Sequence, residues 1–256
     1  MEQIQHRNVE VRGLKLHVAE IGHGPKVVLF LHGFPEIWYT WRHQMLAVAN
    51  KGYRAIAIDF RGYGLSEQPA EPEKGTFKDL ADDVVALLDS LGINKTFLVG
   101  KDFGALPAYL VPALYPERVS GIITLGIPFI QPGLSGVQNH LFPDGFYITR
   151  WQSIHLYMRN LDSVFHCKFH TGRTSALDYG STDPKISSPS LLIMGEKDYF
   201  LKFPGMEDYI RNGTAMKHFV PDLDIIFVAE GNHFVHEQLP DQVNQLILSF
   251  LDKHGI

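Results

Sequence analysis

The residue with the clearest chemistry in this chain is Asp102, which stands at the centre of a turn motif that presents a nucleophile. An apolar run over 96–99 leads into G-K-D-F-G over 100–104, and a helix-compatible stretch follows. This layout is typical of a nucleophile elbow, a tight strand-to-helix turn that lifts one side chain above a sheet. Glycines flank the nucleophile because a Cβ would collide where the backbones meet. Serine at the centre would indicate an esterase, a lipase or a peptidase, whereas aspartate indicates attack on saturated carbon and an alkyl ester on the enzyme.

Two further polar residues, Asp198 and His233, each follow a short apolar run that is predicted to be a strand. In an open α/β sheet, ligands bind outside the carboxyl ends of the strands, so both residues are expected at the same edge as Asp102. Each has an ordinary alternative by itself, because Asp198 fits a turn and His233, with His236 nearby, fits a loop. The order nucleophile, acid, histidine is typical of the catalytic triads of one large class of α/β enzymes. The ordered set is therefore more specific than any of its members.

These residues can meet only if the chain forms a parallel sheet. Apolar runs that alternate with helix-length segments predict an α/β domain with a mostly parallel, twisted sheet and helices on both faces. The predicted strands are an antiparallel hairpin over 7–11 and 14–21, followed by runs over 27–31, 55–58, 96–99, 122–125, 191–194 and 225–228. The predicted helices cover about 38–51, 76–91, the stretch from the elbow to 115, 204–212 and 241–251. Thr76 and Asp79 form a capping-box pattern before the second helix, and Pro107 fits the third helix only in its first turn.

Residues 129–188 interrupt this alternation. They are rich in His, Tyr, Phe, Gly and Ser, and their helical periodicity is weak. We therefore predict a cap or lid inserted over the sheet, with residues 1–128 and 189–256 forming the core domain. A length of 256 residues suffices for one domain with a large core.

The composition favours a cytoplasmic protein with neither nucleic acid nor a membrane as a partner. The formal net charge is −5, and no apolar run reaches the length that spans a bilayer. The N-terminus lacks the apolar core of a signal peptide, and the single cysteine, Cys167, excludes an internal disulfide. We predict no cofactor and no metal, because the histidines in the segment 165–173 match no known ligand spacing.

Five stretches of the sequence carry a resemblance to a known family. They are H-G-F-P-E over 32–36, D-F-R-G-Y-G-L-S over 59–66, G-K-D-F-G-A over 100–105, L-I-M-G-E-K-D over 192–198 and E-G-N-H-F over 230–234. Together they resemble the plant-type soluble epoxide hydrolases of the α/β-hydrolase superfamily, over about residues 9–150 and 182–252. The first two motifs occur widely in the superfamily, so the combination carries the specificity.

The resemblance implies a two-step hydrolysis of an apolar epoxide, lipid-derived or aryl, to a vicinal diol. Asp102 attacks an epoxide carbon and forms a covalent ester. His233, oriented by Asp198, then activates the water that hydrolyses this ester. The backbone N–H groups of Phe34 and Phe103 are placed to stabilise the charge that develops on the ester oxygen in the second step.

The epoxide oxygen needs an acid, and in the family two tyrosines of the cap supply the proton. Tyr147, in Y-I-T-R over 147–150, matches the first of them. Tyr179 is the candidate for the second, although it is displaced in its motif and no arginine follows it. An ordinary loop tyrosine is the alternative at this position, and Tyr157 is a further candidate without a motif. The insertion is shorter than the caps of the family, which predicts a wetter pocket.

Three residues near the nucleophile are expected to shape the pocket. Trp38 is expected to line its wall, with packing in a helix core as the alternative. Phe103 is expected to contribute its ring as well as its N–H. Pro35 is expected to fix the loop that carries Phe34 through a cis peptide bond.

Two other classes of function stay open at this point. A dehalogenase also attacks carbon with an elbow aspartate, but haloalkane enzymes bind halide with an indole N–H that Phe103 lacks. A fluoroacetate-type enzyme would need a cation for the substrate carboxylate, for which Lys101 and Arg61 are candidates. A non-catalytic ligand-binding homologue would fit a degraded cap, but a pure binder does not need the complete set of Asp102, Asp198 and His233.

Overall fold

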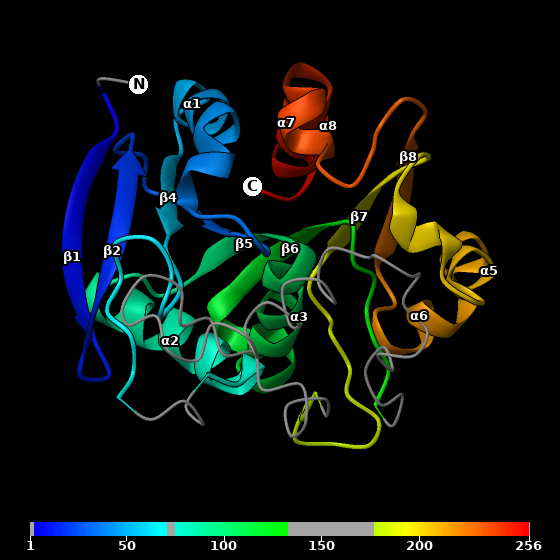
Figure 1. Ribbon diagram of the computed structural model, residues 1–256, viewed down its shortest axis with the longest axis horizontal. Helices are drawn as coiled ribbons and strands as arrows, with labels where there is room; N and C mark the ends of the chain where they lie inside the picture. The colour runs from blue at the N-terminus through cyan, green and yellow to red at the C-terminus, as the bar shows by residue number, and fades with distance from the viewer. Residues whose placement is uncertain (1–2, 71–74, 133–176, 256) are drawn as a thin grey trace, which may run out of the picture.

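The protein is described by a computed structural model over residues 3–70, 75–132 and 177–255, and these residues form an α/β architecture on one sheet (Figure 1). The strands are β1 (Gln5–Val11), β2 (Leu14–Ile21), β3 (Val27–Leu31), β4 (Arg54–Ile58), β5 (Thr96–Lys101), β6 (Val119–Leu125), β7 (Ser190–Gly195) and β8 (Leu223–Val228). Their order across the sheet is β1-β2-β4-β3-β5-β6-β7-β8. The strands from β3 to β8 are parallel, and the β1–β2 hairpin joins them antiparallel at β4. The predicted mostly parallel sheet with an N-terminal hairpin is confirmed.

Helices cover both faces of this sheet (Figure 1). The helices α1 (Arg42–Asn50), α7 (Val235–Gln238) and α8 (Pro240–His254) lie on one face, whereas α2 (Phe77–Ser90) and α3 (Ala105–Leu114) lie on the other. The short helices α5 (Met206–Asn212) and α6 (Thr214–Phe219) connect β7 to β8. Four 3-10 turns complete the described elements: η1 (Trp38–Trp41), η3 (Asp102–Gly104), η4 (Pro116–Arg118) and η6 (Tyr199–Lys202).

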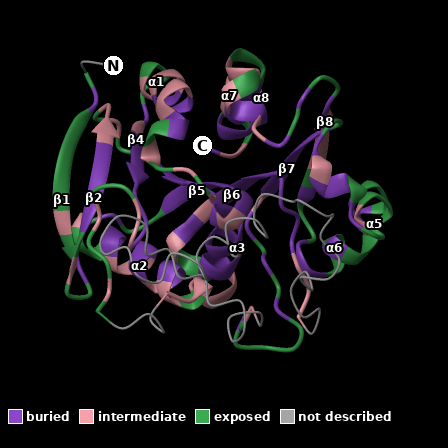
Figure 2. Ribbon diagram, viewed as in Figure 1, coloured by how far each residue is buried: buried purple, intermediate pink, exposed green. Residues whose placement is uncertain are grey.

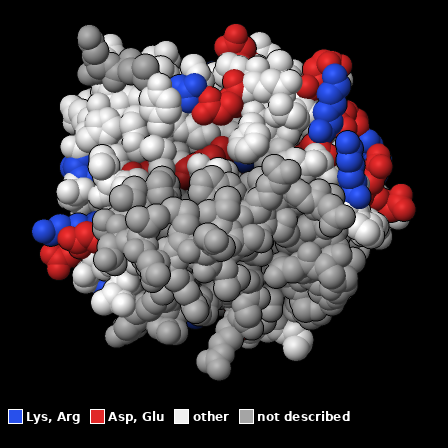
Figure 3. Space-filling view, in the orientation of Figure 1, with Lys and Arg blue, Asp and Glu red and all other residues white. Residues whose placement is uncertain are grey.

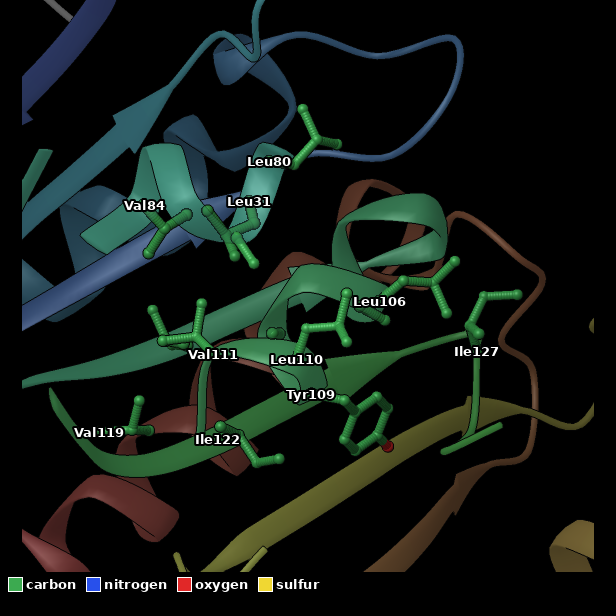
Figure 4. Packing of buried hydrophobic residues seen from close by; sticks show 14 of the residues in the cluster. Leu31, Leu80, Val84, Leu106, Tyr109, Leu110, Val111, Val119, Ile122 and Ile127 are labelled. Atoms are coloured by element: carbon green, nitrogen blue, oxygen red, sulfur yellow. The ribbon is translucent and has the colours of Figure 1, made fainter. Parts of the chain in front are cut away.

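Alternate residues of the central strands enter two different apolar cores, one on each face. In β3, Leu29 and Leu31 belong to the core of α2 and α3, whereas Phe30 belongs to the core of α1 and α8. Figure 4 shows the first core, in which Leu31 lies near side chains of α2 and α3, and Figure 2 shows the buried central strands. Both faces of these strands are covered, which explains why they are continuous apolar runs in the sequence.

Local signals define the helix boundaries as predicted. Thr76 caps α2, because its Oγ1 accepts the backbone N–H of Asp79 while the Asp79 carboxylate accepts the N–H of Thr76. The helix ends just before Gly92, whose φ is 65°. Pro107 lies in the first turn of α3, where its missing N–H has no intrahelical partner to lose.

Three features of the helices differ from the sequence prediction. The predicted helix over 38–51 begins as the 3-10 turn η1, and its α-helical part starts only at Arg42. Helix α6 is absent from the prediction, because Gly213 with a φ of 66° ends α5 and a second short helix follows at once. Helix α7 (Val235–Gln238) is also absent from the prediction, because a single turn is too short to show helical periodicity.

The described ends of the predicted insertion 129–188 pack on the core. Phe129 is buried between Tyr109 of α3 and Phe219 of α6, with ring centroids 5.5 and 5.2 Å away. Ile186 is buried in the same core. The middle of the interval lies outside the described residues, so the division into core and cap stays a prediction.

Candidate active site

Asp102 stands at the turn between β5 and α3 in a backbone conformation that side chains rarely adopt. Its φ is 51°, in the left-handed region, where a non-glycine residue costs on the order of 1–3 kcal/mol and is found mainly at functional sites. A Cβ on Gly100 would lie 2.3 Å from the carbonyl oxygen of Gly104, and a Cβ on Gly104 would lie 2.2 Å from that of Leu31. Close backbone contact therefore requires both glycines, as the elbow motif predicts.

The structure brings the three residues of the predicted triad together at the carboxyl edge of the sheet. His233, in the loop between β8 and α7, places its Nε2 3.0 Å from Oδ2 of Asp102. Its Nδ1 lies 2.9 Å from both carboxylate oxygens of Asp198, which follows β7. All three side chains are buried, and the ring of Tyr199 packs against the imidazole with centroids 4.4 Å apart. This is the arrangement of an acid, a base and a nucleophile in which a carboxylate replaces the usual hydroxyl.

The loop after β3 contributes a hydrogen bond to the nucleophile. The backbone N–H of Phe34 donates to Oδ1 of Asp102 at 2.9 Å. The Phe34–Pro35 peptide bond is cis, as expected. His32 ties this loop to the one after β4, because its Nε2 accepts the N–H of Phe60 at 3.1 Å. One oxygen of Asp102 is thus held by a backbone amide and the other by an imidazole.

Electrostatics keep the nucleophile ionised. Burial opposes the charge of Asp102, but the hydrogen bond from His233 and the positive charge of Lys101 prevail and lower the pKa of Asp102 to about 2. Burial also opposes the charged form of His233, yet its hydrogen bonds to Asp102 and Asp198 outweigh burial and raise the pKa of this imidazole. The carboxylate can therefore attack without a base, while both nitrogens of His233 are engaged.

A buried lysine, Lys101, supplies the positive charge beside Asp102. The sequence suggests Lys101 only as a group that would bind a substrate carboxylate. In the structure its side chain is fully buried, with Nζ 3.1 Å from Oε2 of Glu36 and 4.1 Å from the ring centroid of Phe234. Lysine is almost never fully buried unless it is paired, so a lysine at the end of an apolar strand is the signal in the sequence that points to such a pair.

Tyr179, the predicted second proton donor, is held by the segment that follows β6. Its hydroxyl donates to the backbone carbonyl of Ile130 at 2.9 Å, and its ring lies 5.1 Å from that of Phe129. Burial, together with the neighbouring Tyr109 and Tyr209, raises the pKa of Tyr179 well above its ordinary value. To donate to a substrate, this hydroxyl would have to leave the Ile130 carbonyl.

The predicted pocket residues Phe103 and Trp38 pack against different aromatic side chains. The ring of Phe103 is 6.2 Å from that of Phe34 and 5.8 Å from that of Phe77, at the centroids. Trp38 packs edge-on against His6, with centroids 4.7 Å apart, and its backbone N–H donates to Asp59 at 2.8 Å. The roles of Phe103 and Trp38 in binding stay predictions.

Two predicted features lie outside the described residues. They are the candidate proton donors Tyr147 and Tyr157, and the histidine-containing segment 165–173. Within the described ranges, no three His, Cys, Asp or Glu side chains gather in the manner of a metal site. None of the helices in those ranges combines the length and the apolar character that crossing a bilayer requires.

Comparison with known proteins agrees with this geometry. Residues 26–222 match the family model described as alpha/beta hydrolase fold. Epoxide hydrolase 3 of Siraitia grosvenorii is 34% identical over 318 aligned positions, which cover 99% of this chain and 100% of that protein. The crystal structure of an epoxide hydrolase from Vigna radiata matches with a TM-score of 0.83 and 33% identity over 99% of both chains. A laboratory-evolved variant of a potato epoxide hydrolase matches with a TM-score of 0.81 and 28% identity, over 98% of this chain and 99% of that one.

The fold and the elbow aspartate define a class, the α/β hydrolases whose nucleophile is a carboxylate. This chain belongs to the epoxide hydrolase family of the α/β-hydrolase fold. The alignment with the Siraitia protein has 318 positions for a chain of 256 residues, so about sixty positions of that relative have no counterpart here.

The dehalogenase alternative is not favoured. Both cations that were candidates for binding a substrate carboxylate are already paired, Lys101 with Glu36 and Arg61 with Asp83, which lies 2.6 Å from the Arg61 Nε. Phe103 has no side-chain N–H for a halide. The compared relatives are epoxide hydrolases.

Proposed function

We propose that this protein hydrolyses an apolar epoxide, lipid-derived or aryl, to a vicinal diol through a covalent ester on Asp102. The observation that carries the proposal is the placement of this carboxylate, with Oδ1 on the Phe34 amide at 2.9 Å and Oδ2 on the His233 imidazole at 3.0 Å. A carboxylate with a pKa of about 2 is already ionised, so it attacks carbon without help from a base. A serine in its place would need His233 for its own deprotonation.

In the first step, Oδ2 of Asp102 attacks an epoxide carbon. A C–O bond forms between them, and the ring C–O bond at that carbon breaks with its electron pair on the former ring oxygen. This oxygen takes a proton from an acid, and we assign that role to Tyr147 on the basis of its motif. The product is an alkyl ester of Asp102, in which the carboxylate charge is gone.

In the second step, His233 acts as the base. Loss of the Asp102 charge removes one of the two carboxylates that raise the pKa of His233, so the imidazole releases its extra proton, which replaces the proton that Tyr147 gave to the ring oxygen. Its Nε2 then takes a proton from water, whose oxygen attacks the ester carbonyl. The negative charge develops on Oδ1, where the Phe34 N–H and, in our proposal, the Phe103 N–H stabilise it. Collapse of the intermediate expels the diol, which receives the proton from His233. The second proton of the water returns to His233, and Asp102 is regenerated as a carboxylate with one oxygen from water.

We further propose that residues 129–188 form a shortened cap on a core of residues 1–128 and 189–256. The difference in length from the Siraitia relative supports a shortened segment in this chain. The substrates are then water and one small apolar epoxide, with neither a cofactor nor a metal, and the cytoplasmic location stays a prediction.

The decisive experiment follows the diol and the ester together. The purified protein is incubated with styrene oxide and with a fatty-acid epoxide, and we expect vicinal diol from at least one of them. Asp102→Ala should lower turnover by at least about a thousandfold, because the nucleophile is lost. In His233→Gln the ester should persist, so intact-protein mass spectrometry should show the protein heavier by one substrate molecule.

A matched control is His23→Gln, since His23 is an exposed histidine before β3 that takes no part in the contacts described for the site. It should turn over substrate like the wild-type protein and show no adduct. Absence of diol from the wild-type protein together with absence of an adduct in His233→Gln would contradict the proposal. Halide release from a chloroalkane without diol formation would instead support a dehalogenase.

A further inference from the structure

A chain of buried polar groups leads from Lys101 to helix α7. Lys101 pairs with Oε2 of Glu36, and Oε1 of Glu36 accepts a hydrogen bond from Thr40 Oγ1 at 2.9 Å. Thr40 Oγ1 in turn lies 2.6 Å from Nε2 of His236. Thr40 and His236 are both buried, so water from the surface does not replace these contacts. The chain joins β5, the loop after β3, η1 and α7.

The directions of these hydrogen bonds fix the tautomer of His236. The Thr40 hydroxyl has a single proton, and the two carboxylates beside it, Glu36 and Glu237, can only accept. Thr40 therefore has no proton left for His236, and the Nε2 of His236 must donate to Thr40 Oγ1. Nε2 is also 3.5 Å from Glu36 Oε1, a position where a proton is favoured over a lone pair. Nδ1 is then the nitrogen with the free lone pair.

His236 is also held in its neutral form, so this lone pair persists. Burial, aided by the positive charges of Lys101, His233, Arg42 and His43, lowers the pKa of His236 well below its ordinary value. Glu36 is the carboxylate that faces it from the loop after β3. A neutral imidazole with its proton on Nε2 needs a donor at Nδ1 when it is buried.

Lys101 Nζ has the Glu36 carboxylate as an ion-pair partner but no hydrogen bond, and three further fully buried polar atoms around His236 have no hydrogen-bond partner among the described residues: Nδ1 of His236, Nε1 of Trp41 and Oε1 of Gln44. The rings of Trp41 and His236 pack together with centroids 4.8 Å apart, and Gln44 Nε2 donates to the backbone carbonyl of His236 at 3.0 Å. That second bond also settles the orientation of the Gln44 amide, since Oε1 cannot face a carbonyl. The set therefore consists of one donor, the Trp41 N–H, and two acceptors.

One water molecule is the complement of this set, because it accepts one hydrogen bond and donates two. Buried waters in proteins typically make about three hydrogen bonds to polar groups that lack other partners. We propose that a single buried water binds Trp41, Gln44 and His236, and that it makes His236 a positioning residue for the Glu36–Lys101 pair beside Asp102. The water donates to Nδ1 and so keeps the proton of His236 on Nε2. Nε2 donates to Thr40 Oγ1, so the Thr40 hydroxyl keeps donating its own proton to the Glu36 carboxylate, and Glu36 stays in place for Lys101.

Nuclear magnetic resonance of the whole protein, labelled with ¹⁵N-histidine, tests the water without any assay of activity. We expect His236 to carry its proton on Nε2 and to show an unprotonated, hydrogen-bonded Nδ1, with the signals assigned by their loss in His236→Gln. Trp41→Phe keeps an aromatic ring but removes one partner of the water, so the His236 Nδ1 resonance should shift. A crystal structure should show one ordered water within hydrogen-bond distance of all three atoms. A proton on Nδ1, or a dry site in a structure that shows other buried waters, would overturn the proposal.

Kinetics test the positioning role, which rests on the proposed function. His236→Leu removes the donor to Thr40, and we expect kcat for epoxide hydrolysis to fall by about tenfold or more while KM changes little, because small displacements near the nucleophile are costly. His236→Gln can still donate to Thr40 and should restore most of kcat. Equal losses in the two variants, or no loss in either, would overturn this role. A protein without epoxide hydrolase activity would refute the proposed function, whereas the resonance experiment would still decide the water.

Discussion

His233 has to change its protonation state within one turnover. In the resting site it lies between two carboxylates, at 3.0 Å from Asp102 and 2.9 Å from Asp198, and its pKa is raised. A protonated imidazole cannot act as a base. The proposed ester removes the charge of Asp102 and thereby lowers the pKa of His233 at the moment when a base is required. The nucleophile thus regulates the protonation of its own partner.

This coupling predicts that the ester accumulates at acid pH. As pH falls, a growing fraction of the ester form holds His233 protonated, so hydrolysis slows. Ester formation is not lost in parallel, because Asp102 with a pKa of about 2 stays ionised. Rapid quenching of turnover at a series of pH values, followed by intact-protein mass spectrometry, should show an ester fraction that rises as pH falls. An ester fraction that is constant, or that rises with pH, would contradict the coupling.

The pair of Lys101 and Glu36 predicts a stability effect that depends on which partner is removed. Lys101→Met leaves the Glu36 carboxylate buried without its cation, and we expect a loss of about 3–5 kcal/mol in the free energy of unfolding. The double variant Lys101→Met/Glu36→Gln removes the unpaired charge and should recover more than half of that loss. Urea unfolding of the three proteins measures both quantities. A double variant no more stable than Lys101→Met would show that the pair is not the cause.

The site residues found from the sequence share one property, which is that a local motif marks them. Asp102 lies between two glycines of the elbow, and Asp198 and His233 each follow a strand. The ion pair of Lys101 with Glu36 and the hydrogen bond between His236 and Thr40 were not predicted, because these partners are distant in the sequence. Spacing in one chain does not reveal such contacts.

At the scale of elements, the elbow predicts that lack of space, rather than backbone conformation, makes Gly100 irreplaceable. The Cβ of an alanine there would lie 2.3 Å from a backbone oxygen, and backbone cannot move away as a flexible side chain can. We expect Gly100→Ala to lower the free energy of unfolding by about 1–3 kcal/mol or more, and to lower turnover because Asp102 is displaced. Thermal unfolding and diol formation measure the two effects.

Gly52 provides the matched control for this substitution. It has a φ of 94°, but nothing lies within 4 Å of a Cβ built on it. Gly52→Ala should therefore cost only backbone strain, on the order of 1 kcal/mol, with kcat unchanged. Equal effects of the two substitutions on turnover would contradict the role of close contact at the elbow.

The segment after β6 predicts a structural role for the Tyr179 hydroxyl. Tyr179→Phe leaves the Ile130 carbonyl without the hydrogen bond at 2.9 Å, which should cost about 1–3 kcal/mol of stability. Turnover of styrene oxide should stay within about threefold of the wild-type value, a free-energy change below 1 kcal/mol. Urea unfolding and steady-state kinetics give the two values. A fall in turnover of a hundredfold would instead support Tyr179 as the second proton donor.

Strands were easier to predict than helix details. The parallel strands from β3 to β7 are almost entirely buried, so each contains a continuous apolar run, and the half-buried edge strand β8 keeps such a run over 225–228. The 3-10 turn η1 and the short helices α6 and α7 depend instead on hydrogen bonds and packing that a periodic pattern does not encode. Signals that act within a few residues, such as the capping box at Thr76, were predicted correctly.

At the scale of the whole molecule, the edge strand β8 is flanked by charged side chains rather than left open. Arg211 lies over the ring of Phe227 at 4.3 Å and pairs with Glu196, while Lys253 pairs with Asp224 at 3.2 Å. Figure 3 shows positive and negative groups side by side along this margin. Charged residues at a sheet edge oppose pairing with the strands of other chains.

The architecture as a whole followed from the alternation of strand and helix signals, and the interval that breaks this alternation is where prediction ends. The ends of that interval are apolar and pack on the core, as Phe129 and Ile186 do. The residue where the composition changes is therefore not the residue where the packed core ends. Weak periodicity indicates that an interval differs from the core, but it does not specify which contacts the interval makes.

The separation of the nucleophile from its base along the chain has a consequence for biosynthesis. Asp102 and His233 are 131 residues apart, and the strands β7 and β8 that position Asp198 and His233 are added after all the others. The ribosome therefore synthesises Asp102, which forms the proposed ester, long before Asp198 and His233, which are needed to hydrolyse it. The proposed catalytic cycle can be completed only after translation has passed β8. A chain that ended earlier would contain Asp102 but lack His233, the base that hydrolyses the ester.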